Sequence, residues 1–171
     1  MTLWFTSDLH LGHTNIIKFC NRPFTNVNDM NEIIIGNWNA CVKPDDIVYH
    51  LGDFCFGNPH QYYSRLKGNI LFIPGSHDKN LNGYHLGILS SLYVLNLKEH
   101  EITLCHYAMR SWDKSHYATW HLFGHHHGQL APYGLSFDVG VDTNAFYPYS
   151  LRDVEQKMST LKPIVDYRRK Q

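Results

Sequence analysis

The sequence lacks the features that mark secreted, membrane-spanning and polyanion-binding proteins. Its 171 residues contain no apolar run long enough for a transmembrane helix, and the chain starts without the basic and apolar segments of a signal peptide. Lysine plus arginine equals aspartate plus glutamate at 15 each, so no strong attraction to nucleic acid or acidic membranes is expected. These absences leave a cytoplasmic location, without a membrane partner, as the default expectation.

Cysteine is also scarce. The four cysteines form no CxxC pair and favour reduced thiols over a disulfide scaffold. Apolar residues make up 43% of the chain and charged residues 18%, which argues against intrinsic disorder. A chain of this length can bury a core without disulfides or structural zinc. We therefore expect a single domain over 1–171, with a frayed tail at about 166–171.

Strand-like and helix-like segments alternate along the chain, which favours layered α/β sheets covered by helices. Strands are expected at 3–6, 47–51, 70–73, 92–97, 101–105, 120–123 and 137–141. Helices are expected at 29–42 with Asn28 as N-cap, at 60–67, and from a capping box at 150–153 onward.

Histidine, in contrast, is abundant, with thirteen copies, and it is both the commonest metal ligand and the usual acid or base near neutral pH. Five polar clusters fall at or near the ends of predicted strands, where ligand sites gather in layered α/β folds. The clusters are Asp8-x-His10, Gly52-Asp53, Gly75-Ser76-His77-Asp78, His106 and Gly124-His125-x-His127. Carboxylates and imidazoles in these numbers favour manganese, iron, zinc or nickel over calcium or magnesium alone.

The charges of such a site suit a phosphate. Two divalent ions would bring four positive charges, of which Asp8 and Asp53 would neutralise two. The remaining charge would attract an anionic ester, and paired ions clamp the attacking and leaving oxygens of a displacement at phosphorus. The alternative is that each residue has only a structural role. This alternative has least support where several candidate ligands cluster and most support for His106, which stands alone in the sequence.

The five clusters, in this order and spacing, resemble the signature of calcineurin-like metallophosphoesterases over most of the chain. The stretches GHTNII at 12–17, NRPF at 21–24 and VGVD at 139–142 resemble a compact bacterial and phage branch of that family. The resemblance implies a two-sheet sandwich flanked by helices in four layers. It also implies a dinuclear metal centre and hydrolysis of phosphate esters by a metal-bound hydroxide.

The resemblance also implies a role for each cluster. One metal would be held by Asp8, His10, the bridging Asp53 and His127, and the other by Asp53, Ser76, His106 and His125. His77 would donate a proton to the leaving group or steady the phosphate, with Asp78 orienting it. The candidate substrate-binding residues are His13, Arg22 and Arg110. The planar guanidinium of the two arginines suits the geometry of a phosphate. For Arg22 the alternative is a surface salt bridge.

Two departures from the family pattern bear on function. Ser76 stands where the family usually has asparagine, which predicts a weaker second metal site. Gly52-Asp53 continues into FCF at 54–56, not into the Asp-Arg-Gly run of phosphoprotein phosphatases. We expect activity as a phosphatase or phosphodiesterase on small esters such as nucleotides. The alternatives are a nuclease or end-processing enzyme, which the neutral charge balance does not favour, and a binding or regulatory protein weakened by Ser76.

Overall fold

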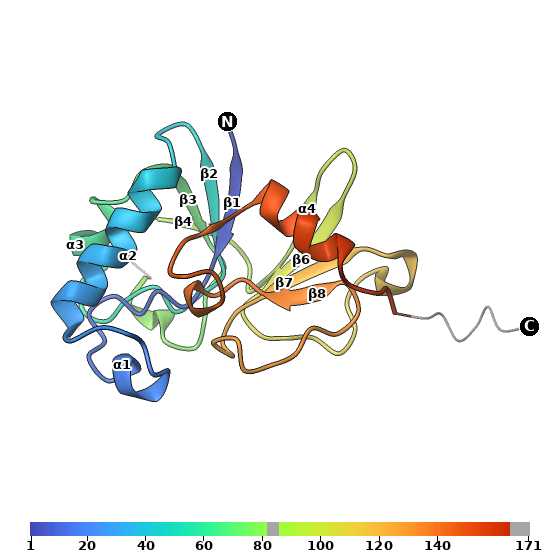
Figure 1. Ribbon diagram of the computed structural model, residues 1–171. Helices are drawn as coiled ribbons and strands as arrows, with labels where there is room; N and C mark the ends of the chain where they lie inside the picture. Colours follow the sequence, from blue (N-terminus) through green and yellow to red (C-terminus); the bar gives the residue numbers. More distant parts are fainter. Residues whose placement is uncertain (82–85, 165–171) are drawn as a thin grey trace, which may run out of the picture.

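Two mixed β-sheets form the framework of the computed structural model, which describes residues 1–81 and 86–164 (Figure 1). The first sheet has the order β4-β3-β2-β1-β9 and contains β1 (Leu3–Thr6), β2 (Ile47–His50), β3 (Asn69–Phe72), β4 (Gly87–Ile88) and β9 (Tyr149–Ser150). The second has the order β5-β6-β7-β8 and contains β5 (Leu92–Asn96), β6 (Glu101–Cys105), β7 (Trp120–Phe123) and β8 (Ser136–Asp138). The edge strands β9 and β5 run antiparallel to their neighbours, and the remaining pairs are parallel.

The predicted strands are present, with one clear change of boundary. Strand β8 ends at Asp138 instead of continuing to 141, because the Asp138 carboxylate accepts a hydrogen bond from the Gly140 amide and turns the chain. Gly140 then pairs with Ser7 at the end of β1, which joins the two sheets. Strands β4 and β9 are not among the predicted strands, since two residues are too few to show an alternating pattern.

The helices correct two sequence predictions. Helix α2 (Val27–Cys41) is capped by Asn26, whose side chain accepts from the amides of Asn28 and Asp29 at 2.9 and 3.0 Å, so the predicted cap at Asn28 is wrong. Helix α3 (His60–Tyr63) is shorter than predicted, because the chain continues in i to i+3 turns before Gly68 at a φ of 92°.

Helix α4 (Leu151–Ser159) begins with the predicted capping box between Ser150 and Asp153. Helix α1 (Ile16–Phe19) is a single turn that the sequence analysis missed. The remaining helical turns are the 3₁₀ segments η1 (Asp78–Leu81), η2 (Ser115–Tyr117) and η3 (Val141–Thr143).

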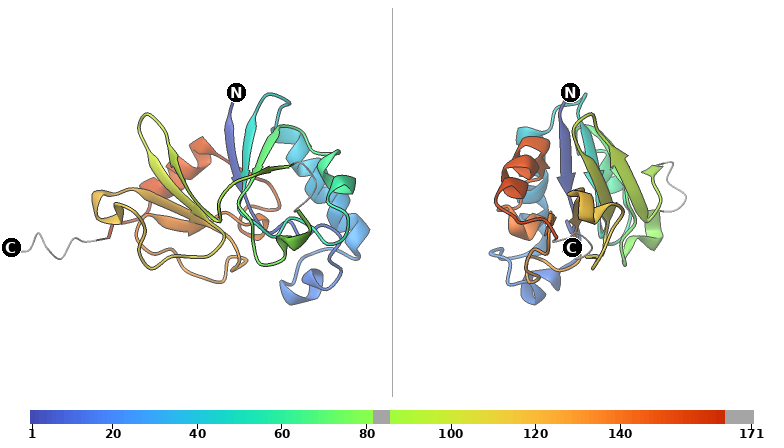
Figure 2. Two further views of the ribbon diagram at one scale, coloured as in Figure 1. Left: turned by 180° about the vertical axis from the view of Figure 1, so that it is seen from behind. Right: turned by 90° about the vertical axis from the view of Figure 1, so that its right-hand side faces the viewer.

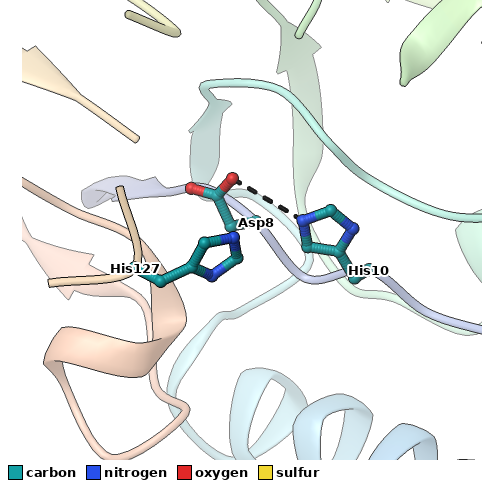
Figure 3. A group of neighbouring side chains, drawn as sticks. All are labelled: Asp8, His10 and His127. Carbon is teal, nitrogen blue, oxygen red and sulfur yellow. Dashed lines mark ion pairs between the residues drawn. The ribbon is translucent and has the colours of Figure 1, made fainter. Parts of the chain in front are cut away.

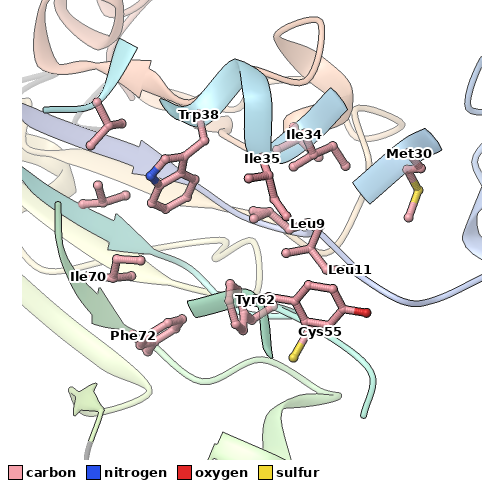
Figure 4. Packing of buried hydrophobic residues seen from close by; sticks show 14 of the residues in the cluster. Leu9, Leu11, Met30, Ile34, Ile35, Trp38, Cys55, Tyr62, Ile70 and Phe72 are labelled. Atoms are coloured by element: carbon pink, nitrogen blue, oxygen red, sulfur yellow. The ribbon is translucent and has the colours of Figure 1, made fainter. Parts of the chain in front are cut away.

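Two apolar clusters fill the spaces on either side of the first sheet. The first cluster packs α2 against one face of the sheet. It contains Ile34 and Trp38 of α2 together with Val48, Ile70 and Phe72 of the strands, and Figure 4 shows Trp38, Ile70 and Phe72 among its members. The second cluster lies between the sheets and joins residues such as Phe5, Tyr49, Leu51, Leu104 and Leu122. Successive residues of β1, β2 and β3 therefore face opposite clusters, as the period of two in a strand requires.

Helix α4 contributes Val154 and Met158 to the second cluster and contacts β9 and β1 (Figure 2). This arrangement of two mixed sheets with helices is the α/β sandwich that the sequence predicted. The four cysteines form no disulfide. None of the helices in the described ranges combines the length and apolar character that a membrane crossing needs. The tail predicted at 166–171 lies outside the described residues.

Candidate metal centre

The candidate ligands follow the carboxyl ends of parallel strands in both sheets. Asp8 and His10 follow β1, Asp53 follows β2, His106 follows β6, and His125 and His127 follow β7. Backbone contacts hold these ends together: the Asp8 amide donates to the Gly52 carbonyl at 2.9 Å, and the Gly124 amide donates to the His106 carbonyl at 3.0 Å. The sheets thus bring residues from positions 8 to 127 to one place.

Two groups of potential ligands result. The first half of the centre contains Asp8, His10 and His127, whose ligand atoms lie within 4.8 Å of one another (Figure 3). The second half contains Asp53, His106 and His125, within the same limit. The halves are neighbours, because the Nε2 atom of His10 lies 3.8 Å from Asp8 Oδ1 and 3.7 Å from Asp53 Oδ2.

The donor atoms fit a cation better than they fit one another. Asp8 Oδ1, His10 Nε2 and His106 Nε2 are buried without a hydrogen-bond partner. The nearest carboxylate oxygens lie 3.7 Å or more from His10 Nε2 and 3.5 Å from His106 Nε2, so the candidate ligands do not satisfy one another. Buried polar atoms without partners are costly in an ordinary core. Two divalent cations would give all of them a partner, so the residues present fit the metals that the sequence resemblance implies.

Two histidines have their tautomers set for this role. His106 Nδ1 lies 2.7 Å from the Leu51 carbonyl oxygen, and His127 Nδ1 lies 2.7 Å from Asp142 Oδ2. Both acceptors are oxygens, so Nδ1 must carry the proton in each neutral ring. The Nε2 lone pair is then left to face a metal, which is the usual arrangement of metal-binding histidine.

The backbone around the centre is unusual. Five candidate ligands adopt the left-handed conformation, with φ between 49° and 69°: Asp8, His10, Asp53, His125 and His127. Residues other than glycine seldom adopt this conformation, and it persists at functional sites where the surrounding structure enforces it. Its concentration in the predicted ligands supports a shared function for these five residues.

A glycine allows the loops that carry the second half to pack closely against one another. A Cβ atom on Gly52 would lie 2.6 Å from both the Gly75 backbone and His106 Nδ1, so no side chain fits there. Gly52 also has a φ of 94°, which other residues rarely adopt. Gly52 therefore lets the chain before Asp53 pack directly against Gly75 and the His106 ring.

Burial shifts the acid–base properties of both halves. Burial raises the pKa of Asp8 to about 7 and lowers the pKa of His10 to about 3. Burial also acts to raise the pKa of Asp53, but His106, the His77 amide and His10 outweigh it, so the pKa is lowered. These groups are held where their charged forms are poorly solvated, an environment that a bound cation would improve.

Ser76 lies in the second half, as predicted. Its hydroxyl lies 3.1 Å from Asp53 Oδ2 and 3.3 Å from Oδ1 and donates to this carboxylate. The hydroxyl proton is therefore directed at Asp53, while the oxygen remains next to the candidate ligands. Ser76 thus touches the residue predicted to bridge both ions.

The two predicted catalytic residues have different surroundings. The side chain of His77 is 51% exposed, and its Nε2 lies 4.0 Å from Asp53 Oδ2, at the open side of the centre. Asp78 is buried, and its carboxylate accepts from the amides of Asp53, Phe54 and Gly75 at 2.7 to 2.9 Å. Asp78 therefore braces the loops that carry Asp53 and Ser76, and the prediction that it orients the His77 ring is wrong.

The prediction that Arg22 binds substrate is also wrong. Its side chain has no exposed surface, and its guanidinium is fully engaged by protein acceptors, including Asp142. No donor is left for a substrate phosphate, and the alternative of a surface salt bridge fails because the pair is buried. The contact of Asp142 with His127 has no counterpart in the sequence prediction, where Asp142 appears only within the stretch 139–142.

The other two predicted substrate-binding residues differ in position. His13 stacks on Phe56 with ring centroids 4.0 Å apart and lies 5.5 Å from the His10 ring, at the centre. Arg110 lies over the Tyr133 ring at 5.1 Å and borders a pocket of about 330 Å³ whose lining contains none of the candidate ligands. Binding of substrate by these two residues stays a prediction.

Known proteins resemble this chain in sequence and fold. The uncharacterised protein MJ1445 of Methanocaldococcus jannaschii is 34% identical over 161 residues, which cover 87% of this chain and 86% of that protein. Protein AQ665 of Aquifex aeolicus, whose function is unknown, has a crystal structure that matches with a TM-score of 0.73 at 22% identity, covering 91% and 98% of the two chains. The phosphoesterase YfcE from E. coli matches more weakly, with a TM-score of 0.46 at 18% identity over 82% and 78%. No family profile matches the chain.

Proposed function

We propose that this chain, whose ligand motifs resemble those of calcineurin-like metallophosphoesterases, hydrolyses small phosphate monoesters or diesters at a dinuclear metal centre. The observation that carries the proposal is the pair of ligand groups, Asp8–His10–His127 and Asp53–His106–His125, with unpartnered buried atoms directed between them. Manganese, iron, zinc and nickel suit this mixture of oxygen and nitrogen ligands. The cytoplasmic location remains a prediction.

The residues of the chain divide the work of such a reaction. Two bound cations would supply Lewis acidity and positive charge for the phosphate oxygens. Asp53, placed between the halves, would hold both ions, and Ser76 would steady Asp53 through its hydroxyl. His77 is exposed beside Asp53, so it can reach a leaving oxygen and donate a proton to it.

The surroundings of the centre favour a substrate with a flat aromatic group. Phe56 is 36% exposed and Phe19 is 70% exposed, and both rings contact His13, forming an aromatic rim of three residues. Phe56 also contacts His10 and His77, at 6.1 and 5.4 Å between ring centroids. Exposed aromatic rings beside a phosphate site can stack on a nucleobase or an aryl leaving group. The rim supports nucleotides and aryl esters as the substrate class.

A panel of esters tests this proposal. Purified protein would be assayed with aryl, alkyl and nucleotide mono- and diesters in Mn²⁺, Ni²⁺ or Zn²⁺, and also with single-stranded DNA. We expect hydrolysis of aryl and nucleotide esters to exceed that of alkyl esters with the same charge. Asp53→Asn should lower the rate by at least about 10²–10³-fold, the loss typical when one electrostatic group of an active site is removed.

Each other outcome has a defined meaning. Undiminished hydrolysis by the Asp53→Asn variant would contradict the proposed centre. Hydrolysis confined to DNA would favour the nuclease alternative. Binding of two ions without turnover of any ester would favour the regulatory alternative that Ser76 suggests.

A further inference from the structure

The guanidinium of Arg22 is saturated by contacts with the first half of the centre and its surroundings. Nε donates to Asp142 Oδ1 at 2.8 Å, and Nη2 donates to Asp142 Oδ2 at 2.7 Å, a bidentate pair. Nη2 also donates to the Asp8 carbonyl at 2.7 Å, while Nη1 donates to the Leu9 carbonyl at 3.0 Å and to the Met30 sulfur at 3.4 Å. These contacts account for all five N–H groups of an arginine.

Two of these contacts hold the turn that carries the first ligands. Asp8 and His10 both adopt the left-handed conformation. The carbonyls of Asp8 and Leu9 belong to the two peptide bonds that connect these residues. The Arg22 guanidinium donates to both carbonyls and thereby fixes the backbone of this turn. The side chains of Asp8 and His10 then face the candidate cation without rearrangement.

Asp142 extends the same network to the third ligand. Its Oδ2 atom accepts from Arg22 and also lies 2.7 Å from His127 Nδ1. The carboxylate thereby holds the His127 ring in place and keeps the proton on Nδ1, leaving Nε2 for a metal. One buried ion pair, whose partners are 120 residues apart in the sequence, therefore contacts segments that carry all three members of the first half.

We propose that Arg22 and Asp142 are positioning residues that preorganise the first half of the centre and leave the second half unaffected. The inference rests on the proposed metal centre. Within the described residues, neither Arg22 nor Asp142 forms a hydrogen bond with the second half, which contains Asp53, His106 and His125. The pair should therefore govern the affinity for one ion of the two.

Calorimetric titration of the metal-free protein with Mn²⁺ tests this inference. Asp142→Asn keeps the size of the side chain but removes its charge, and loss of such an outer partner typically lowers metal affinity 10–100-fold. We expect this loss for one of the two ions and a change below about twofold for the other. Arg22→Lys should weaken the same ion, because one ammonium group cannot replace five directed donors.

Two further variants identify the ion and exclude a general effect on folding. His125→Ala should weaken the ion that Asp142→Asn leaves unchanged. Arg65→Lys alters an exposed arginine–carboxylate pair with Glu32, at 2.6 Å, and should change neither affinity. Circular dichroism would verify that each variant is folded, and Arg22→Lys provides the test if Asp142→Asn is not.

The results separate this inference from the proposed function. Equal weakening of both ions, as expected for a role in folding alone, would overturn the inference, and so would wild-type affinity in both variants. A wild-type protein that binds no Mn²⁺, Ni²⁺ or Zn²⁺ would instead contradict the proposed metal centre itself.

Discussion

The two halves of the candidate centre offer the same kinds of ligand but differ in their surroundings. In the first half, Asp8 and His10 are at most 3% exposed, and His127 is held by the carboxylate of Asp142. In the second half His106 is buried and held by the Leu51 carbonyl, but His125 is exposed and Ser76 replaces the expected amide. Ligand chemistry alone would make the halves equal. Because the first half is more buried and better braced, we expect it to bind its ion more tightly than the second half.

Removal of one histidine from each half is the most direct way to break this comparison. His127→Ala should weaken the tighter ion by at least about 100-fold, since a direct ligand should matter more than an outer partner. His125→Ala should weaken the other ion by about tenfold, because an exposed and less constrained ring contributes less. Mn²⁺ titration by calorimetry measures both values. Equal losses, or a larger loss for His125→Ala, would show that burial does not distinguish the two halves.

The two carboxylates should have opposite effects on the stability of the metal-free protein. The pKa of Asp8 is raised to about 7, so the folded protein binds more protons at Asp8 than the unfolded chain between about pH 4 and 7. This contribution to stability is present below pH 4 and is lost as the pH rises through 7. At pH 8, Asp8→Asn should therefore increase the free energy of unfolding, on the order of 1–3 kcal/mol.

Asp53 differs because its pKa is lowered below the usual value. Its ionised form stabilises the fold above pH 4, so Asp53→Asn should lower the free energy of unfolding at pH 8. Urea unfolding in the presence of EDTA, at pH 5 and pH 8, measures both effects. Stabilisation by both substitutions, or by neither, would contradict the assigned difference between the halves.

The sequence predicted which side chains gather at the candidate centre better than it predicted the residues that support them. Asp8, His10 and Asp53 belong to local motifs whose spacing is visible in the chain, and parallel strands bring such motifs together. The contact of Asp142 with Arg22 spans 120 residues, and nothing in the spacing of either residue indicates that the two meet. The guanidinium was therefore assigned to substrate, although burial commits it to the protein.

The same limit explains the error at Asp78. The sequence placed this carboxylate next to His77, and proximity in the chain suggested that it orients the imidazole. In the structure the Asp78 carboxylate points inward and accepts from three backbone amides. Two of these amides belong to Asp53 and Phe54, so the contact depends on the path of that loop. A side chain that accepts from the amides of a distant loop, unlike one that caps its own helix, leaves no local sequence pattern, so such support becomes visible only when the fold is known.

A substitution at Ser76 tests the comparison in the opposite direction, because it should make the metal affinities of the two halves more similar. Ser76→Asn places a carbonyl oxygen on a longer side chain next to Asp53, where the present hydroxyl donates at 3.1 Å. An additional oxygen ligand should raise the affinity for the weaker ion by about tenfold, which corresponds to about 1.4 kcal/mol. The tighter ion should change much less, since position 76 reaches that half only through the shared carboxylate of Asp53.

Mn²⁺ titration together with ester hydrolysis at limiting metal would measure this gain. Ser159→Asn, at the exposed end of α4, is the matched control and should change neither quantity. If Ser76→Asn left the weaker affinity unchanged, the open second half would be explained by the exposure of His125 alone. If it strengthened both ions equally, the substitution would act through Asp53, and the two halves would be coupled through their shared carboxylate more strongly than their separate contacts indicate.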